Sequence, residues 1–489
     1  MSIVMLITMV VCFALTISVA VSIGLSAIFG IQASNLNMLI SVKEMFSAIN
    51  KFPLAAIPFF ILAGNLMETG GISKRLVDFA KSLVGGVQGG LPMTCVLTCM
   101  IFAAVSGSSV ATTFAIGAIL IPALIKHGYP TPWAASLQAT SAELGVIIPP
   151  SIPMILYGVS AEVSIGELFI AGFGPGLLIG AALMLFVYVV CRRKGWGKND
   201  GDGRLPLSTA FIDLAVIAAG VALLIIGNKF IGPALMGANA SEGQRDRYTD
   251  LIGVGLFAAY FVALSLIPKV RKALHGRAAY ALMMPVIILG GIYGGVFTPT
   301  EASAVAVVYA LFVGVVIYGE ISWRDLAPIF KKSVVSSSVI MFIIANAGLF
   351  AFLITRAGVP DAIGQYLKEV LQSPMLFLLG VNAALFFIGM FIETSAAIIV
   401  LAPILAPVAV YFGIDPVHFG IIMVVNLALG MITPPFGVNL FAACTVAKIS
   451  LDRIITQLIP FVLVILVCLM IITYVPQISL FLRDIVYAK

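Results

Sequence analysis

Long apolar stretches are the feature that most constrains what this chain can fold into. The runs Ser2–Gly30, Gly176–Cys191, Leu214–Gly227 and Leu458–Tyr474 contain no charged residue. They approach or exceed the ~20 apolar residues that a helix needs to cross a bilayer. Only 10% of the 489 residues are charged and 61% are hydrophobic, which leaves too little polar surface for a water-soluble domain. The sequence therefore predicts an all-α polytopic membrane protein.

The first apolar run is interpreted as a span rather than as a cleaved signal peptide. No basic segment precedes it, and no small-residue cleavage site clearly ends it. The six cysteines lie mostly within apolar runs and predict buried structural thiols rather than a metal site or a disulfide.

The charged residues indicate topology rather than a charged ligand. The net charge of +6 comes from basic residues spread over many short loops, without interleaved aromatic residues, which argues against nucleic-acid binding. The densest basic clusters, Arg192–Lys194 and Lys269–Arg277, predict cytoplasmic loops, and the loops near Asp361 and Asp415 predict the outer side. These assignments place both termini outside, although Arg483 near the C-terminus runs against the rule.

The chain repeats itself when it is shifted so that Pro149-Pro150 lies on Pro434-Pro435. The same ungapped shift aligns several further pairs, namely Phe102 with Phe387, Pro122 with Pro407, Gly128 with Gly413, and Gly145 with Gly430. Apolar coincidences are frequent in so hydrophobic a chain, but paired prolines and helix-breaking glycines are not. The pattern predicts two copies of one transmembrane unit.

Each copy contains an apolar run that ends in a small polar cluster. Leu91–Val105 leads to Ser106-Gly107-Ser108-Ser109, and Met375–Ile392 leads to Glu393-Thr394-Ser395. A second apolar run then ends at a glycine turn, and most of these runs are shorter than a full span of ~20 residues. We expect two re-entrant hairpins, at 91–126 and 375–412, with polar tips at mid-membrane, where irregular backbone must be buried or line a cavity.

A helix that must break follows each hairpin, at 131–160 and 416–447. The paired prolines remove backbone donors and clash with the preceding turn. Unwinding frees carbonyl oxygens that suit Na⁺, while the half-helix beyond the break presents its positive dipole end to an anion. The alternative is a simple proline kink, but two kinks that each follow a polar hairpin favour ion and anion sites.

The predicted organisation is a first repeat over 1–204, an inserted helix pair over 205–268 and a second repeat over 269–489. Lys126-His127 places the base of the first hairpin inside, whereas Asp415 places that of the second outside, so the repeats are inverted. Two amphipathic stretches, Ile72–Leu83 and Val359–Leu371, predict arms along the membrane surface or, alternatively, short solvated loop helices.

Three acidic residues, Glu143, Glu301 and Glu393, stand in apolar surroundings. A carboxylate near the bilayer centre costs roughly 2.5–3.5 kcal/mol, so each is expected to face a cavity or a partner. Glu301 follows Pro299 and predicts a helix N-terminal carboxylate. Glu393 is expected to help hold a cation or to pair within the mobile domain. For Glu143 such a role and that of a helix N-terminal carboxylate both stay open. Arg356 is the basic residue nearest to an apolar run that could meet an anionic solute, but its position favours a side chain that reaches the membrane interface.

Five motifs together resemble the large membrane subunit (M subunit) of TRAP transporters, the tripartite ATP-independent periplasmic systems. They are Ile57–Asn65, Ser106–Thr112, Ile148–Ser151, Gly294–Ala302 and Thr433–Asn439, and the resemblance covers nearly the whole chain. The departure is the helix pair within 205–268, where the family usually has a short loop.

The resemblance implies a Na⁺-driven, elevator-type importer of a small organic anion, a C4-dicarboxylate or another carboxylate, in the bacterial inner membrane. It implies Na⁺ as coupling ion with no further cofactor. It also implies two protein partners, a small four-helix Q subunit and a periplasmic substrate-binding P protein.

The family's sodium sites correspond here to the hairpin tips and helix breaks. The expected sodium-binding residues are Ser106, Ser108, Ser109, Gly145, Ile148, Thr394, Ser395, Gly430 and Thr433. The expected substrate-binding residues are Ser109, Thr113, Ser151, Thr394 and Asn439.

Two other functions compete with this one. A related stand-alone sodium–dicarboxylate symporter of the divalent-anion family would work without a binding protein. A membrane-embedded enzyme is disfavoured because no histidine lies deep in a span to activate Ser106 or Ser109. The sequence also has no two-histidine metalloprotease motif and no P-loop.

Overall fold

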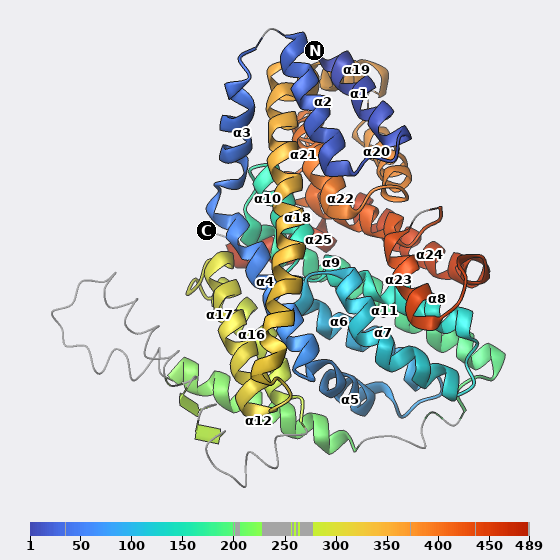
Figure 1. The fold of residues 1–489 in the computed structure, drawn as a ribbon. Helices are drawn as coiled ribbons and strands as arrows, with labels where there is room; N and C mark the ends of the chain where they lie inside the picture. The colour runs from blue at the N-terminus through green and yellow to red at the C-terminus, as the bar shows by residue number, and fades with distance from the viewer. Residues whose placement is uncertain are drawn as a thin grey trace, which may run out of the picture.

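The computed structural model describes residues 1–34, 36–198, 200, 206–226, 256, 259–260, 263–264, 277–371, 373–435 and 437–487. Within these ranges the chain is all-helical, with no β-strand (Figure 1). Seven of the described helices are long and apolar enough to cross a membrane, or up to nine if each of two bent helix pairs is one span. These helices confirm the predicted all-α polytopic membrane class.

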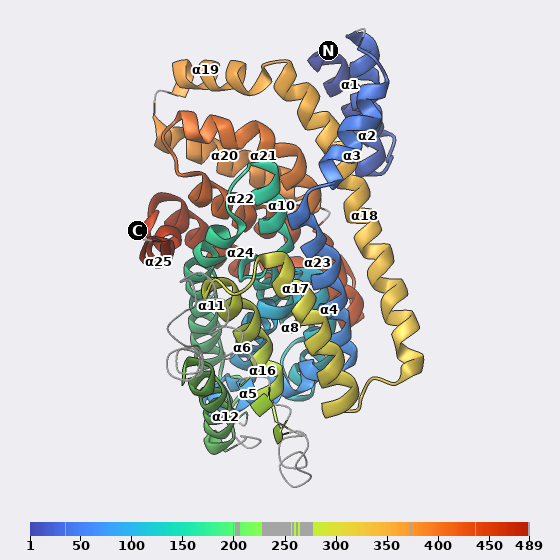
Figure 2. The same cartoon turned by 90° about the vertical axis from the view of Figure 1, so that its left-hand side faces the viewer.

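One group of helices, which we call the frame, is built around the 34-residue helix α18. Figure 2 shows α18 running from one end of the molecule to the other, with α2, α3 and α4 packed against it. The frame comprises α1 (Ser2–Ala14), α2 (Val19–Ala33), α3 (Leu39–Ile49), the 3₁₀ turn η1 (Phe52–Ala55), α4 (Ala56–Thr69), α16 (Ala279–Tyr293), α17 (Pro299–Phe312), the π-helical segment η4 (Val313–Ile317) and α18 (Trp323–Arg356).

Capping residues explain where two frame helices begin. Thr298 and Glu301 form a reciprocal capping box at the start of α17, with the Glu301 carboxylate accepting from the Thr298 backbone amide at 2.8 Å. Ser322 and Asp325 do the same for α18. Such boxes satisfy backbone donors that a helix start would otherwise leave unpaired. The expectation for Glu301 as a helix N-terminal carboxylate is confirmed.

Two helical hairpins stand beside the frame. The first hairpin consists of α6 (Gly90–Ser106) and α7 (Ser109–Lys126), and the second of α20 (Pro374–Gly389) and α21 (Thr394–Tyr411). Each chain reversal occurs at the polar cluster of its repeat. Gly107 ends α6 in the left-handed region with φ of 61°, a conformation that glycine adopts without strain.

The helix that follows each hairpin is broken at its proline pair. In the first repeat, α8 (Thr131–Ala142) and α9 (Leu144–Ile147) are followed by α10 (Ile152–Ser160), with a bend of 42°. In the second repeat, α22 (Pro416–Met431) is followed by α23 (Val438–Ala447). The Pro149-Pro150 and Pro434-Pro435 peptide bonds are both cis.

The two repeats exchange their second half-helices. α10 of the first repeat packs against α21 and α22 of the second, and α23 of the second packs against α7 and α8 of the first. In Figures 1 and 2 α20 and α21 lie toward the end that carries α19, and α6 lies toward the end that carries α5. The broken helices therefore meet between hairpins that approach from opposite ends of the molecule.

The two amphipathic stretches are helices, α5 (Ile72–Val84) and α19 (Val359–Leu371). They lie at opposite ends of the molecule (Figures 1 and 2). After each broken helix comes a long helix, α11 (Ile165–Lys194) or α24 (Leu451–Tyr474), and the C-terminal helix α25 (Gln477–Tyr487) packs back on α11.

The segment after each long helix returns to the base of the preceding hairpin. Beyond α11, Asp200 accepts from the Tyr129 hydroxyl at 2.7 Å and from the Leu91 amide at 3.2 Å, which ties together both arms of the first hairpin. Beyond α24, Arg483 donates to Asp415 at 2.7 Å, directly after the second hairpin. Arg483, the basic residue that runs against the topology rule, thus has an acidic partner at this base.

One helix of the predicted inserted pair is described. α12 (Leu207–Ile226) packs against α5 and α16. The second member of the pair falls on residues that lie outside the described ranges.

Candidate ion and substrate site

The tip of the first hairpin is a compact group of hydroxyl and carbonyl oxygens. The Thr112 hydroxyl donates to the Ser108 carbonyl at 2.8 Å and lies 3.0 Å from the Ser106 hydroxyl. Ser108 is the N-cap of α7 and its side chain accepts from the Ala111 amide at 3.4 Å. Ser106 and Ser109 are both buried. Thr112, one helical turn beyond Ser108, is a member of this group that the sequence interpretation missed.

Gly145 brings the broken helix against this tip. A Cβ atom at Gly145 would lie 2.7 Å from the Thr112 hydroxyl and 2.8 Å from the Ser108 carbonyl oxygen. Any side chain there would displace the tip, so only glycine permits the approach. The structure thus brings together Ser106, Ser108 and Gly145, three of the residues expected to bind sodium.

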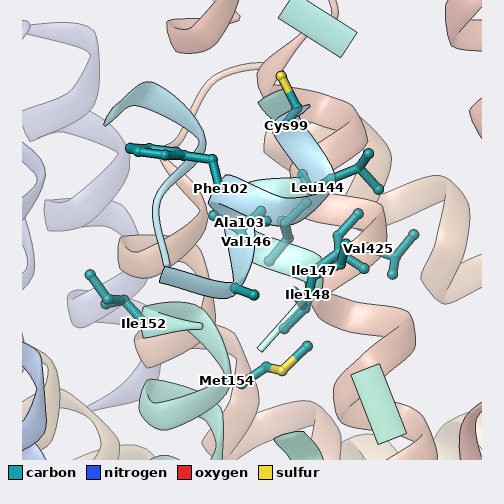
Figure 3. Close-up of a cluster of buried hydrophobic side chains, with 14 of the residues drawn as sticks. Cys99, Phe102, Ala103, Leu144, Val146, Ile147, Ile148, Ile152, Met154 and Val425 are labelled. Carbon is teal, nitrogen blue, oxygen red and sulfur yellow. The ribbon is translucent and has the colours of Figure 1, made fainter. Parts of the chain in front are cut away.

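The short helix α9 is held by an apolar shell. Figure 3 shows Leu144, Val146, Ile147 and Ile148 packed among Cys99, Phe102 and Ala103 of α6, Ile152 and Met154 of α10, and Val425 of α22. Ile148 ends α9 in an extended conformation, with φ of −82° and ψ of 129°. Because apolar side chains surround the break, its freed backbone groups have few polar neighbours other than the hairpin tip.

The break in the first repeat contacts the first tip directly. The Ile152 amide donates to the Gly107 carbonyl at 3.4 Å. Ser151 is the N-cap of α10, and its hydroxyl donates to the Val146 carbonyl at 2.6 Å. Ser151 is therefore buried at the start of a half-helix, where the positive dipole end favours an anion.

The second tip has the same backbone plan and a different chemistry. Glu393 is the N-cap of α21, with one carboxylate oxygen accepting from the Ala396 amide at 3.1 Å and the other from the Ser395 hydroxyl at 2.8 Å. The Thr394 hydroxyl contacts the Met431 sulfur at 2.8 Å, beside Gly430. Sequence interpretation had no means of finding Met431, an apolar residue on another helix.

Gly430 also marks a close approach of backbones. A Cβ atom there would lie 2.5 Å from the Gly389 Cα at the end of α20. Thr433, three residues on, donates from its hydroxyl to the Leu429 carbonyl at 2.8 Å. In the second repeat Gly430 and Thr433 thus lie at the helix break and Thr394 lies at the hairpin tip. In the first repeat Gly145 and Ser108 hold the corresponding places.

A buried polar group joins the two repeats. The Asn439 side chain on α23 donates to Glu143 Oε1 at 2.7 Å and to the Ala139 carbonyl at 3.0 Å, and its oxygen accepts from the Thr113 hydroxyl on α7. Glu143 is 2% exposed and Asn439 is fully buried. We call Thr113, Glu143 and Asn439 the bridging group.

The bridging group contains two of the expected substrate-binding residues, Thr113 and Asn439. Ser109 lies beside the Glu143 carboxyl group. Ser151 and Thr394 are instead engaged in hydrogen bonds of their own. The sequence marks Glu143 as unusual because it is an acid in an apolar run. Its partner Asn439 on α23 is 296 residues away in the chain, so the sequence does not reveal the contact.

The cysteines and Arg356 lie outside this bridging group. All six cysteines are buried and free, which confirms them as structural thiols. In the ranges described, no group of three or more His, Cys, Asp or Glu side chains is arranged to hold a metal ion. Arg356 is exposed and lines a separate cavity of about 490 Å³ with Lys51, Glu44 and Glu162, between the frame and α21.

Comparison with known proteins identifies the family. A sequence model described as "Tripartite ATP-independent periplasmic transporter, DctM component" matches residues 6–478. The C4-dicarboxylate TRAP transporter large permease protein DctM of Pseudomonas aeruginosa is 40% identical over 90% of this chain and 88% of its own. The sialic acid TRAP transporter large permease protein SiaM of Vibrio cholerae is 31% identical, over 91% of this chain and 89% of its own.

A fused relative and a solved structure extend the comparison. The isethionate TRAP transporter permease protein DctMQ of Oleidesulfovibrio alaskensis is 36% identical over 95% of this chain and 64% of its own. The Alcanivorax borkumensis YdaH transporter matches in fold, with a TM-score of 0.56 at 14% identity over 91% of this chain and 86% of its own. These relatives are named as transporters and not as enzymes. The chain is a multi-pass membrane protein that belongs to the DctM family of large permease subunits of tripartite ATP-independent periplasmic transporters.

Proposed function

We propose that this chain imports a small organic anion across the bacterial inner membrane by coupling its movement to Na⁺. The observation that supports this most is the duplicated contact between a hairpin tip and a glycine of a broken helix. Gly145 lies against Ser108 and Thr112, and Gly430 lies against Gly389. Broken helices at a repeat interface are the plan by which secondary transporters hold ions and substrate.

Oxygen ligands at the tips support sodium as the coupling ion. The first tip offers the hydroxyls of Ser106 and Thr112 and the Ser108 carbonyl, which lie within hydrogen-bond distance of one another. Hard cations such as Na⁺ prefer oxygen ligands of this kind. The proposed second site uses Thr394, Ser395, Gly430 and Thr433, with Glu393 beside them.

The ends of the helices support an anionic substrate. α7, α10, α21 and α23 all begin at the tips or breaks, so their positive dipole ends converge on the region between the repeats. Relatives are named for C4-dicarboxylate, isethionate, sialic acid and 2,3-diketo-L-gulonate, which are all organic anions. We propose a C4-dicarboxylate or a related carboxylate for this chain.

We further propose two protein partners and an elevator mechanism. A relative in which the large permease is fused in one DctMQ polypeptide supports a small Q subunit beside this chain. A periplasmic binding protein would deliver the anion. The hairpins and broken helices would move as one block along the frame, because their contacts with each other cross between the repeats.

Uptake into proteoliposomes tests the proposal. The large subunit is reconstituted with its small subunit, and uptake of a labelled C4-dicarboxylate is measured with and without a Na⁺ gradient and with and without the binding protein. We expect uptake only when both the Na⁺ gradient and the binding protein are present. Robust uptake without the binding protein would favour the stand-alone symporter, and uptake that ignores Na⁺ would refute the coupling ion.

Two substitutions localise the ion sites. Ser108→Ala removes the N-cap hydroxyl that fixes the first turn of α7 and with it the Ser108 carbonyl, and Thr394→Ala removes one hydroxyl from the second tip. We expect each to raise the Na⁺ concentration needed for half-maximal uptake about three- to tenfold, because one hydrogen bond or hydroxyl ligand is worth about 1 kcal/mol. Unchanged Na⁺ dependence in both variants would contradict the proposed sites.

A further inference from the structure

Glu143 is a buried carboxyl group whose hydrogen-bond needs are only half met. Its Oε1 accepts from Asn439, but its Oε2 has no hydrogen-bond partner among the described residues. The side chain is 2% exposed, and none of the ion pairs found in the described ranges includes it. A buried carboxylate keeps its charge only when it is paired or coordinated and is otherwise protonated, so a charged Oε2 needs a cationic neighbour.

Among the described residues, the surroundings of Glu143 offer no such neighbour. Asn439 on α23 and Ser109 on α7 are neutral, and the charged group whose field reaches Glu143 is Glu393, a second acid. Other titratable groups on the helices packed against α8 and α9 are thiols, phenols and groups toward the helix ends, namely Cys95, Cys99, Lys126, Tyr157, Glu167, Tyr188, Cys191, Arg192, Arg193, Lys194, His418, Cys444, Asp452, Arg453, Cys468 and Tyr474. None of these is within hydrogen-bond distance of Oε2.

The comparison with Glu393 sharpens the point. Both oxygens of Glu393 are occupied, one by the Ser395 hydroxyl and the other by the Ala396 amide. Glu393 lies at the second tip and Glu143 lies on the first broken helix beside Ser109, and of the two acids only Glu143 keeps a free oxygen among the described residues. That oxygen belongs to the residue two positions before Gly145, which touches the first tip.

We propose that Glu143 is a direct, charged ligand of the cation at the first hairpin tip, through Oε2. This inference rests on the proposed function and names a ligand beyond the hydroxyl and carbonyl oxygens already assigned. A single carboxylate among neutral oxygens suits a monovalent hard cation such as Na⁺. Oε1 holds Asn439, so a cation on Glu143 also orients the half-helix α23 of the other repeat.

This arrangement links the cation to the anion site. Asn439 shares its amide oxygen with Thr113, so both remaining members of the bridging group depend on the position of Glu143. Without a cation, the Glu143 charge repels an organic anion bound beside Asn439. With one, that repulsion is cancelled, so Na⁺ and the anion each strengthen the binding of the other.

The test measures Na⁺ itself as the ligand. The full chain with its small subunit is purified in detergent, and its melting temperature is followed as NaCl replaces choline chloride at constant ionic strength. Ligand that binds the folded state raises the melting temperature. For Glu143→Gln, which keeps the shape and the Asn439 contact, we expect the midpoint of the Na⁺ response to rise at least about tenfold. Glu301→Gln, which alters an exposed helix cap, is the matched control and should keep the wild-type midpoint.

The outcomes separate the inference from the proposed function. If the wild type shows no Na⁺ response in melting or uptake, the coupling ion itself is wrong. If the wild type responds and Glu143→Gln responds with the same midpoint, Na⁺ coupling stands and Glu143 is not a ligand. If Glu143→Gln folds poorly, Glu143→Asp is tested instead, by Na⁺-dependent uptake. It should raise the half-saturating Na⁺ concentration, and an unchanged value there would also overturn the assignment.

Discussion

The first and second repeats share their backbone devices but differ in where they keep their polar groups. In both, the second hairpin arm begins at an N-cap, Ser108 or Glu393, that accepts from the amide three residues on. In both, a glycine of the broken helix lies against the hairpin. The acid, however, is at the tip in the second repeat and on the broken helix, as Glu143, in the first.

This contrast shows which constraints the fold imposes. Close approach and helix capping depend on backbone geometry, so they are the same in both repeats. Side-chain chemistry is restricted only by the partners that each repeat provides. The corresponding sites of the two repeats can therefore bind different groups within one architecture. Substitutions at equivalent positions of the two repeats test this comparison.

The largest effect is expected at the paired glycines. In Gly430→Ala the new Cβ meets the backbone of Gly389, whereas in Gly145→Ala it meets the Thr112 side chain as well as the Ser108 carbonyl. Backbone atoms of two packed helices yield less than a side chain, so we expect Gly430→Ala to cost roughly 3 kcal/mol or more and Gly145→Ala about 1–3 kcal/mol. Melting temperature and monodisperse yield in detergent measure both. A greater loss for Gly145→Ala would break the ranking.

The next effect concerns equivalent positions on the two broken helices. Asn426 donates to Asn382 Oδ1 at 2.7 Å, and Asn382 in turn donates to the Thr473 hydroxyl at 3.1 Å, which joins three helices of the second repeat. The equivalent Ser141 hydroxyl has no hydrogen-bond partner among described residues. We expect Asn426→Leu to destabilise by about 1–3 kcal/mol and Ser141→Ala by much less than 1 kcal/mol. Similar losses in melting temperature for the two variants would contradict this expected difference between the repeats.

A smaller effect is expected at the base of the first hairpin. Asp200 is 3% exposed and accepts from Tyr129 and from the Leu91 amide. Asp200→Asn keeps the shape but replaces a charged acceptor, so we expect a loss of about 1–2 kcal/mol. The melting temperature measures it, with Tyr129→Phe as the companion variant that removes only the hydroxyl donor. A wild-type melting temperature for both variants would mean that the hydrogen bonds of Asp200 do not stabilise the base of the hairpin.

The smallest effect is expected at the base of the second hairpin, and it depends on pH. Burial works against ionisation of Asp415, but the Arg483 guanidinium and the amides of Val417 and His418 outweigh it and lower the pKa of Asp415. A lowered pKa in the folded state gives stability that is present above the unfolded value of about 3.9 and is lost as pH falls through the folded value. For Arg483→Gln we expect a loss of about 1 kcal/mol or less at pH 7, because the pair is partly solvated.

Melting curves of wild type and Arg483→Gln from pH 7 downward check this expectation. Their difference should shrink below about pH 4, as Asp415 becomes protonated. A difference that stays constant over this range would assign the loss to packing of the Arg483 stem on α11 rather than to its charge.

Features that depend on neighbours along the chain were predictable from the sequence. Uncharged apolar runs specify membrane helices because the bilayer cannot satisfy a free backbone. The Thr298–Glu301 cap was readable because its two partners are three residues apart. The matching proline pairs and glycines indicated a duplicated unit, and the five motifs indicated the family that the comparisons show.

Which side chains of different repeats meet became visible only in the three-dimensional fold. Glu143 was left between two interpretations, and its contact with Asn439 joins residues 296 positions apart. The Thr394–Met431 contact and the return of Arg483 to Asp415 are equally invisible along the chain. The physical reason is that local geometry sets where a helix begins, bends and ends, whereas the crossing of α10 and α23 between repeats sets the partners of a buried polar group.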